Sequence, residues 1–312
     1  MPGRTPSAGD LSLLEGWIVA SYGRRYLVEV PVYGELDCVT RGKRGNLACG
    51  DRVATAPGAP GQGVIEATAA RTSLLYRSDA SRQKLIAANV TQVVIVVAAV
   101  PPCHDELVNR CLVAAEHGRM AALIVLNKAD LPESAAAFDF LDLYRGLGYR
   151  VLALSAKRDV RPLRPLLQGH VSVLVGQSGT GKSTIINQLL PLAAAHTAEV
   201  SRALGSGRHT TTHARLYHLD PASHVIDSPG MQAFGLHHMD PDEVVHGFVE
   251  FRPFIGLCRF RDCRHLGEPG CAVAAAGDAQ RISLRRLAAY RAVAQELARA
   301  NKRPIRPRHA RR

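Results

Sequence analysis

The chain has 312 residues, but only 5% of them are aromatic and none of its apolar runs is long. The longest continuous apolar stretch spans 93–100, and Pro101 and Pro102 then end it, whereas a membrane-spanning helix needs roughly 20 apolar residues. The first nine residues lack the apolar core of a secretory signal. We therefore expect a soluble, cytoplasmic protein that does not associate with membranes.

Cysteines and acidic residues are also scarce. The seven cysteines are odd in number and unevenly spaced, which argues against a disulfide scaffold and favours a reducing compartment. The 27 Asp and Glu are outnumbered by 39 Lys and Arg, giving a formal net charge of +12. This excess favours a polyanionic partner, because neutralising phosphates releases counterions; a membrane surface is the alternative. Few of the basic residues are lysine, so lysines inside motifs stand out.

The apolar patterns predict three domains. Short alternating runs separated by glycine turns follow a flexible N-terminus and predict a small all-β barrel. Long apolar strands that alternate with helices then predict an α/β fold with a parallel sheet buried on both faces. The last part is rich in Cys, His and Arg, and we expect a helix over 279–300 before a basic tail. The expected domains span 1–78, 79–236 and 237–312.

The segment Gly176–Thr184, GQSGTGKST, satisfies the phosphate-loop pattern G-x-x-x-x-G-K-[ST]. It follows the apolar strand 171–175 and precedes a helix, which is where phosphate binding requires it. Backbone amides of such a loop surround the β-phosphate. Lys182 bridges the β- and γ-phosphates as a catalytic residue, and the Ser183 hydroxyl holds Mg²⁺.

Two later segments are expected to meet the γ-phosphate. Asp227-Ser-Pro-Gly230 ends an apolar strand and forms a D-x-x-G motif, whose carboxylate binds Mg²⁺ through water and whose glycine amide meets the γ-phosphate. The polar stretch 205–213 lies between the two motifs, and its Thr211 is expected to reach Mg²⁺ when this switch is ordered. Ser183, Thr211 and Asp227 are the expected magnesium ligands, directly or through water.

Two motifs typical of guanine recognition precede the phosphate loop. Asn127–Asp130 (NKAD) and Ser155–Lys157 (SAK) each follow an apolar strand, so both are expected at the carboxyl edge of the sheet. Asp130 can accept hydrogen bonds from guanine N1–H and the exocyclic amine, which adenine does not offer in that arrangement. The Ala156 amide can donate to guanine O6, while Asn127 can brace neighbouring loops.

The order of these motifs is that of a circularly permuted GTPase, because the base-reading motifs come before the phosphate loop. A permuted chain can build the same site, since the residues must be adjacent in space and not in sequence. The residues expected to bind GTP are Asn127, Lys128, Ala129, Asp130, Ser155, Ala156, Lys157, Gly176, Gln177, Ser178, Gly179, Thr180, Gly181, Lys182, Ser183, Thr184, Thr211, Asp227 and Gly230.

A metal cluster is expected near the end of the chain. Cys258, Cys263, His265 and Cys271 place four soft or borderline ligands within 14 residues. Such a group is typical of a closed tetrahedral zinc site, whose metal contributes directly to folding. The remaining cysteines have no such grouping, and we interpret them as ordinary core or surface residues.

Together these motifs resemble the RsgA (YjeQ) family of ribosome small-subunit biogenesis GTPases over nearly the whole chain. The resemblance rests on NKAD, SAK, the phosphate loop, GRHTTT at 207–212, D-x-x-G with the following Phe-Gly-Leu, and the four zinc ligands. It implies an N-terminal OB-fold, a permuted GTPase domain and a C-terminal zinc domain. It also implies a late-acting factor that docks on the immature 30S subunit through rRNA, hydrolyses GTP there and leaves.

Basic residues at both ends of the chain agree with an RNA partner. Arg41, Lys43 and Arg44 occupy a glycine-containing loop of the expected barrel, as in OB-folds that meet nucleic acid. The tail 302–312 carries six basic residues and no acidic one. We expect the barrel loop to bind RNA.

The residue after the D-x-x-G motif is Met231, where Ras-like enzymes have the glutamine that orients the attacking water. Methionine cannot do this, so slow intrinsic hydrolysis is expected, together with stimulation by the ribosome. Another residue must position the water. His238 is our first candidate for this catalytic role, with His237 and His209 behind it.

Two other functions stay open at this point. An adenine-specific P-loop ATPase or kinase would have no use for NKAD, and competition between ATP and GTP distinguishes it. A GTP-stabilised RNA-binding protein without significant turnover would agree with Met231, and product analysis distinguishes it. A monomer is expected, because the sequence gives no sign of an oligomer interface.

Overall fold

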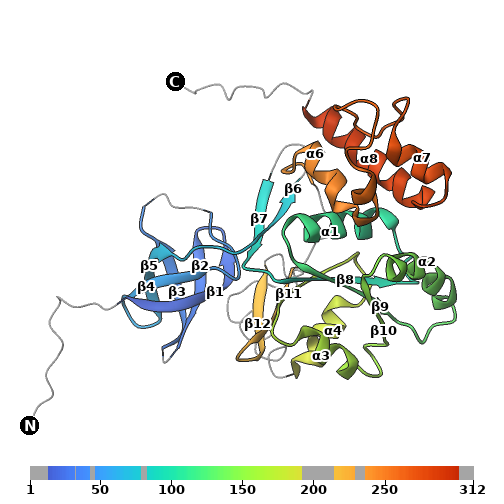
Figure 1. Ribbon diagram of the computed structural model, residues 1–312. Coiled ribbons are helices and arrows are strands. Elements are labelled where there is room, and N and C mark those ends of the chain that lie inside the picture. Colours follow the sequence, from blue (N-terminus) through green and yellow to red (C-terminus); the bar gives the residue numbers. More distant parts are fainter. Residues whose placement is uncertain are drawn as a thin grey trace, which may run out of the picture.

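The computed structural model describes residues 13–31, 33–42, 46–78, 83–191, 214–228 and 236–301. A closed barrel lies at one side of a larger sheet, and the helices from the end of the chain lie over one face of that sheet (Figure 1). No helix within these ranges is long and apolar enough to cross a membrane.

The N-terminal barrel is closed by β1, which pairs with both β2 and β4. Its core is a separate apolar cluster that includes Ile18, Val28 and Val53. The predicted barrel is confirmed, and β3 adds a strand that its sequence does not announce, because only Leu36 and Cys38 of β3 are buried. In order around the barrel, the strands are β1 (Leu14–Tyr22), β2 (Arg25–Val30), β3 (Gly34–Thr40), β5 (Gln62–Thr68) and β4 (Arg52–Pro57).

The larger sheet has five parallel strands, as the continuous apolar runs predict. Both β8 and β11 are buried along their whole length. Alternate side chains of β8 enter two different cores, one under α1 (Asp105–His117) and the other under α4 (Lys182–Leu189). In sheet order, the parallel strands are β10 (Arg150–Ala153), β9 (Ala121–Asn127), β8 (Gln92–Ala98), β11 (Val171–Val175) and β13 (Ser223–Asp227).

Strand β12 (Arg215–Asp220) joins the sheet to the barrel. It pairs antiparallel with β13 and contacts β1 where Arg215 is opposite Ala20, so one sheet of 11 strands runs through both parts. The Arg215 guanidinium also donates to the Glu35 carboxylate of β3 at 2.8 Å. The strand β12, which pairs with the strand that ends at the D-x-x-G motif, is thus fixed to the barrel by backbone and by charge.

A hairpin of β6 (Leu74–Ser78) and β7 (Gln83–Ala88) forms a separate two-stranded sheet, and Ala87 of β7 bridges to Cys49. The predicted border after residue 78 coincides with the end of β6, and the two domain borders remain a prediction. The cysteines without a metal grouping are ordinary, as expected: Cys38, Cys49 and Cys111 are buried and Cys103 is half-buried.

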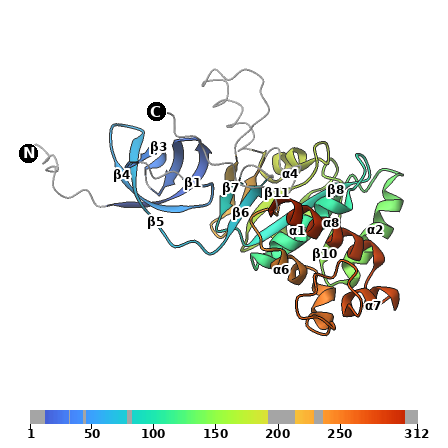
Figure 2. The ribbon, with the colours of Figure 1, turned by 90° about the horizontal axis from the view of Figure 1, so that it is seen from above.

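The C-terminal helices pack on α1, on the side away from α4 (Figures 1 and 2). Arg286 of α8 is fully buried there and donates to the Glu250 carboxylate at 2.6 Å, while its guanidinium lies 4.4 Å from the Phe248 ring centroid. These elements are α6 (Pro241–Val244), the 3₁₀ turns η2 (Val245–Gly247) and η3 (Val249–Phe254), α7 (Ala272–Asp278) and α8 (Leu284–Asn301).

The predicted helix over 279–300 begins too early. Helix α7 already ends at Asp278, and Gln280 then adopts a left-handed conformation with φ of 57°. The chain turns through the next residues, and α8 begins at Leu284. Nothing in the apolar spacing reveals this turn, because its residues continue the helical pattern. The remaining helices of the sheet are α2 (Ser134–Gly146), α3 (Arg164–Leu167) and the 3₁₀ turn η1 (Arg161–Leu163).

Candidate nucleotide site and metal centre

The phosphate loop connects β11 to α4 at the carboxyl edge of the sheet. Close contacts explain two of its glycines: a Cβ on Gly176 would lie 2.3 Å from the Val96 carbonyl oxygen, and one on Gly181 would lie 2.2 Å from Asn127 Nδ2. Gly181 also has a φ of 93°, in the left-handed region. Any larger residue at either position would displace the loop or the strand behind it.

Lys182 and Asp227 influence each other across the site. Burial lowers the pKa of Lys182 and raises that of Asp227, and in each case the charge of the other residue opposes the effect of burial. The Lys182 ammonium donates to the carbonyl oxygens of Gly176 at 2.7 Å and Gln177 at 2.9 Å. The structure thus brings the phosphate-loop lysine and the D-x-x-G carboxylate together, as a site for Mg²⁺ and triphosphate requires.

Asn127 links the base-reading motifs to the phosphate loop. Its Nδ2 donates to the Thr180 carbonyl at 2.8 Å, and its Oδ1 accepts from the Ala156 amide at 2.9 Å. The amide that we expected to donate to guanine O6 is therefore bonded to Asn127 in this structure. The side chain is only 2% exposed, so both bonds lie in a low-dielectric interior where such bonds are strong. One amide therefore fixes NKAD, SAK and the phosphate loop relative to each other, which confirms the predicted bracing.

The carboxylate of Asp130, the expected base-reading residue, is held in its ionised form. A hydrogen bond from the Ser155 side chain lowers its pKa, and Arg158 at 3.4 Å and Lys157 add positive charge. An ionised carboxylate only accepts hydrogen bonds, which matches the two adjacent donors of guanine. Lys128 adopts a φ of 59° beside it. Arg158 is an addition that the SAK motif does not reveal, since it lies one residue beyond.

The structure places His238 away from the phosphate loop. Its ring lies 5.3 Å from that of Tyr76 on β6, and burial together with the charge of His117 lowers its pKa. His117 ends α1, which runs back from the carboxyl edge of the sheet, so His238 lies toward the opposite edge. His237 pairs instead with Glu296 of α8 at 2.9 Å.

Some predicted residues lie outside the described part of the chain. They are Lys43, Arg44, His209, Thr211, Gly230, Met231 and the tail 302–312. Arg41 is described: it is exposed and pairs with Glu66 at 3.1 Å. Such a surface ion pair contributes little free energy, so Arg41 can exchange it for a phosphate.

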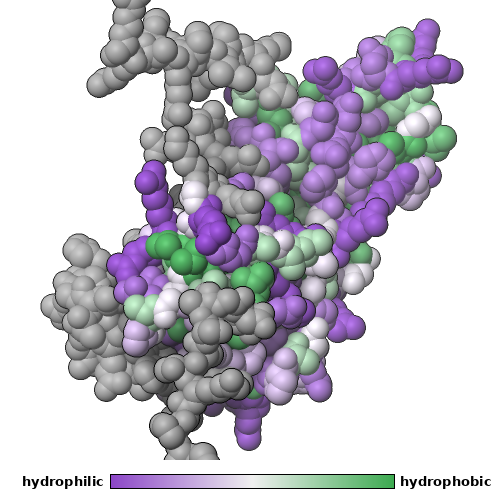
Figure 3. Space-filling view, turned by 90° about the vertical axis from the view of Figure 1, so that its left-hand side faces the viewer, coloured by the Kyte–Doolittle hydropathy of each residue, from purple (hydrophilic) through white to green (hydrophobic). Residues whose placement is uncertain are grey.

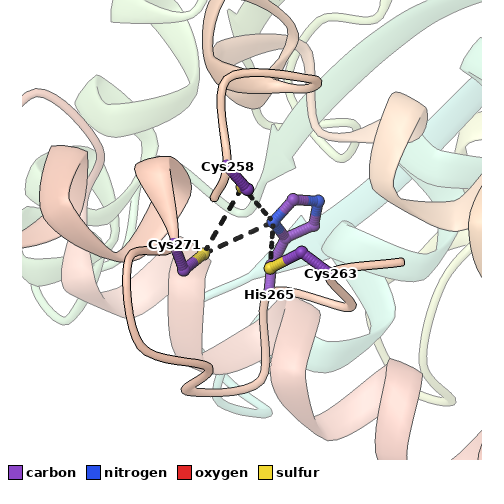
Figure 4. A group of neighbouring side chains, drawn as sticks. All are labelled: Cys258, Cys263, His265 and Cys271. Carbon is purple, nitrogen blue, oxygen red and sulfur yellow. Dashed lines mark hydrogen bonds between the residues drawn. The ribbon is translucent and has the colours of Figure 1, made fainter. Parts of the chain in front are cut away.

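The four predicted metal ligands converge between η3 and α7 (Figure 4). Their ligand atoms all lie within 4.8 Å of one another. His265 Nδ1 is 3.4 Å from Sγ of both Cys258 and Cys271 and 3.6 Å from Sγ of Cys263, while the sulfurs of Cys258 and Cys271 are 4.0 Å apart. A tetrahedral zinc site has S···N edges of about 3.5 Å and S···S edges of about 3.8 Å. The cluster could therefore hold a metal ion after only a small approach of its sulfurs.

Backbone amides surround this cluster and support charged sulfurs. The Ala272 amide donates to Cys258 Sγ at 3.3 Å, and the Ala274 amide donates to Cys271 Sγ at 3.4 Å. These are the contacts that stabilise thiolates around a metal. Tyr290 of α8 donates to the Arg264 carbonyl at 2.7 Å, so the cluster is also tied to the C-terminal helix.

Comparison with known proteins identifies the family. The family model for RsgA GTPases matches residues 68–237, which is more than half of the chain. The chain belongs to the RsgA GTPase family. An RsgA protein of Nitrosospira multiformis, named small ribosomal subunit biogenesis GTPase, is 56% identical over 278 residues, or 89% of both chains. One of Neisseria gonorrhoeae with the same name is 50% identical over 293 residues, or 94% of this chain and 95% of that one.

Solved structures agree with the RsgA assignment. YjeQ from Thermotoga maritima is similar with a TM-score of 0.70 and 30% identity, covering 92% of this chain and 99% of that one. YloQ, a circularly permuted GTPase, is similar with a TM-score of 0.67 and 25% identity, covering 97% and 100%. The chain is thus a circularly permuted GTPase, and neither the adenine-specific enzyme nor the protein without turnover describes it.

Proposed function

We propose that this RsgA-family GTPase acts in the late maturation of the small ribosomal subunit, docks on that subunit through rRNA and hydrolyses GTP there. Its relatives carry small-subunit biogenesis in their names. The observation that carries the GTP-binding part of the proposal is the double hydrogen bond of Asn127, because it joins the guanine-recognition motifs and the phosphate loop in one preformed site. Such a site binds and hydrolyses GTP specifically.

The surface supports a charged partner rather than an apolar one. The chain carries a net charge of +12. On the face that Figure 3 shows, hydrophilic side chains predominate over the described residues, and hydrophobic patches are small and interrupted. This suits contacts with phosphates, which need cations rather than broad apolar areas. We propose that Arg41, Lys43 and Arg44 contribute such contacts, and that the protein acts as a cytoplasmic monomer.

We assign roles to the site residues by their chemistry. Lys182 bridges the β- and γ-phosphates, and Ser183, Thr211 and Asp227 hold Mg²⁺ directly or through water. Asp130 reads the guanine base, with Ser155 and Lys157 beside it. The Cys258, Cys263, His265 and Cys271 cluster holds one structural Zn²⁺, because three sulfurs and one imidazole favour this metal over magnesium or calcium.

GTP hydrolysis with purified ribosomal subunits tests the function. We expect slow turnover by the protein alone and large stimulation by small subunits, but not by large ones, at a fixed salt concentration. Tight GTP binding without stimulation by small subunits would contradict the proposed partner while leaving the GTPase assignment intact.

The His238→Ala variant tests the proposed water-positioning residue. The histidine must leave its place beside Tyr76 to reach the γ-phosphate, so we expect the variant to keep its GTP affinity and lose stimulated turnover by about 10²-fold, the usual contribution of a general acid or base. Single-turnover hydrolysis with small subunits measures this. Unchanged stimulated turnover would rule out this role, and the His237→Ala variant would then be compared.

A further inference from the structure

The connection between β8 and α1, residues 99–104, touches both halves of the nucleotide site. The Lys128 ammonium of the NKAD motif donates to the Val100 carbonyl at 2.7 Å. On the phosphate loop, a Cβ placed on Gly179 would lie 3.4 Å from Pro101 Cδ, so the proline ring lies against the loop backbone. This connection belongs to neither motif but contacts one residue of each.

The far end of this connection is held by the C-terminal helix. Asp105 begins α1, and its carboxylate forms an ion pair with Arg285 of α8. The same guanidinium lies 4.5 Å from the ring centroid of Phe140 on α2. Helix α2 in turn starts four residues after the NKAD motif. Arg285 therefore connects α8 to the first turn of α1 and to α2.

The connection borders an open pocket on the side of α2. The pocket has a volume of about 400 Å³, with Ala99, Pro102, Cys103, Phe140 and Arg285 among its lining residues. Ala99 and Cys103 pack against the core, while the polar contacts of the segment lie at its ends. At the α1 end, Asp105 Oδ1 is buried without a hydrogen-bond partner within the described part of the chain. The Asp105 side chain is therefore held by its other oxygen, Oδ2, which accepts from Arg285.

We propose that Arg285 is a positioning residue for guanine-nucleotide binding. Through Asp105 it fixes the 99–104 connection, which orients Lys128 along the base and supports the phosphate loop at Gly179. This inference rests on the proposed GTP site and adds that the C-terminal helix sets its affinity. Because binding coupling is reciprocal, a partner that moves α8 away from α1 weakens nucleotide binding, and bound nucleotide resists that movement.

The contacts involve the base motif and the phosphate loop, not the γ-phosphate. Removing Arg285 should therefore weaken GDP and GTP binding by the same factor, about 5- to 20-fold, within the usual range of coupling between sites. Turnover at saturating GTP should stay unchanged. Removing a residue that acted on the γ-phosphate would instead weaken GTP binding more than GDP binding.

Fluorescent GDP and a non-hydrolysable GTP analogue, titrated into the full-length protein, measure this. We compare the wild type with Arg285→Ala, Arg285→Lys, Asp105→Asn and, as a control, Arg299→Ala, an exposed arginine of the same helix. We expect Arg285→Ala and Asp105→Asn to lose equal affinity for both nucleotides, and the variant that combines them to lose no more. Arg285→Lys should recover part of the affinity, and Arg299→Ala should bind both nucleotides as the wild type does.

Unchanged affinities in Arg285→Ala would overturn the proposal, and so would a loss confined to the GTP analogue. Thermal unfolding and metal content show whether each variant is folded. If Arg285→Ala is unfolded, the nearly isosteric Asp105→Asn decides the question by the same criteria. A wild-type protein without guanine selectivity would instead contradict the proposed GTP site. Failure of the Arg285 proposal and failure of the GTP site therefore give different results.

Discussion

Asp130→Asn is expected to lower GTP affinity by about 10²- to 10⁴-fold and to shift preference toward xanthosine nucleotides. Asparagine replaces one carboxylate oxygen, which accepts hydrogen bonds, by an amide NH₂ group, which donates them. One guanine donor then faces this NH₂ group, and both groups stay unpaired at a cost of about 1 to 3 kcal/mol each. Xanthine carries an oxygen where guanine has its amine and can accept from this donor. Competition binding of GTP, XTP and ATP measures the change.

The structure makes this variant a clean test. The wild-type carboxylate is ionised and fixed by Ser155, and the amide of asparagine has the same shape. Asp142→Asn on α2 is the matched control, because its carboxylate pairs only with Arg145 among the interactions described and lies outside the motifs. Guanine selectivity retained by Asp130→Asn would show that another residue reads the base.

Cys271→Ser is expected to release the metal and to unfold the region around the cluster. A structural zinc ion contributes about 10 to 16 kcal/mol in zinc-finger peptides, which is as large as the net stability of a whole domain, about 5 to 15 kcal/mol. Cys271 is also the N-cap of α7, where its Sγ accepts from the Ala274 amide. Serine can keep this cap, so the variant removes the metal ligand selectively. Metal content by mass spectrometry and the thermal unfolding midpoint measure the effect.

Cys103→Ser is the control for this experiment, since Cys103 is half-buried and remote from the cluster in sequence. It should keep one metal ion per chain and nearly wild-type stability. A strong chelator should reproduce the effect of Cys271→Ser in the wild type. Full metal content in Cys271→Ser, or unchanged stability after the metal is removed, would contradict a structural role for the cluster.

The amino-acid sequence by itself determined those parts of the protein in which ligand binding or burial requires particular residue types close together in the chain. Gly176 and Gly181 of the phosphate loop have no room for a side chain, and the proposed reading of guanine needs a carboxylate acceptor such as Asp130. The four metal ligands lie within 14 residues, so the short loop alone brings them together. Strongly apolar strands likewise revealed the parallel sheet, because burial on both faces leaves no alternation.

Tertiary structure alone decided the contacts between distant segments. Strand β12 joins the barrel to the larger sheet, Gln280 interrupts the expected helix, and His238 lies beside Tyr76 rather than the phosphate loop. Arg285 lies 180 residues from its partner Asp105. No local pattern marks such pairs, because their energy comes from packing and charge contacts that exist only after the chain has folded.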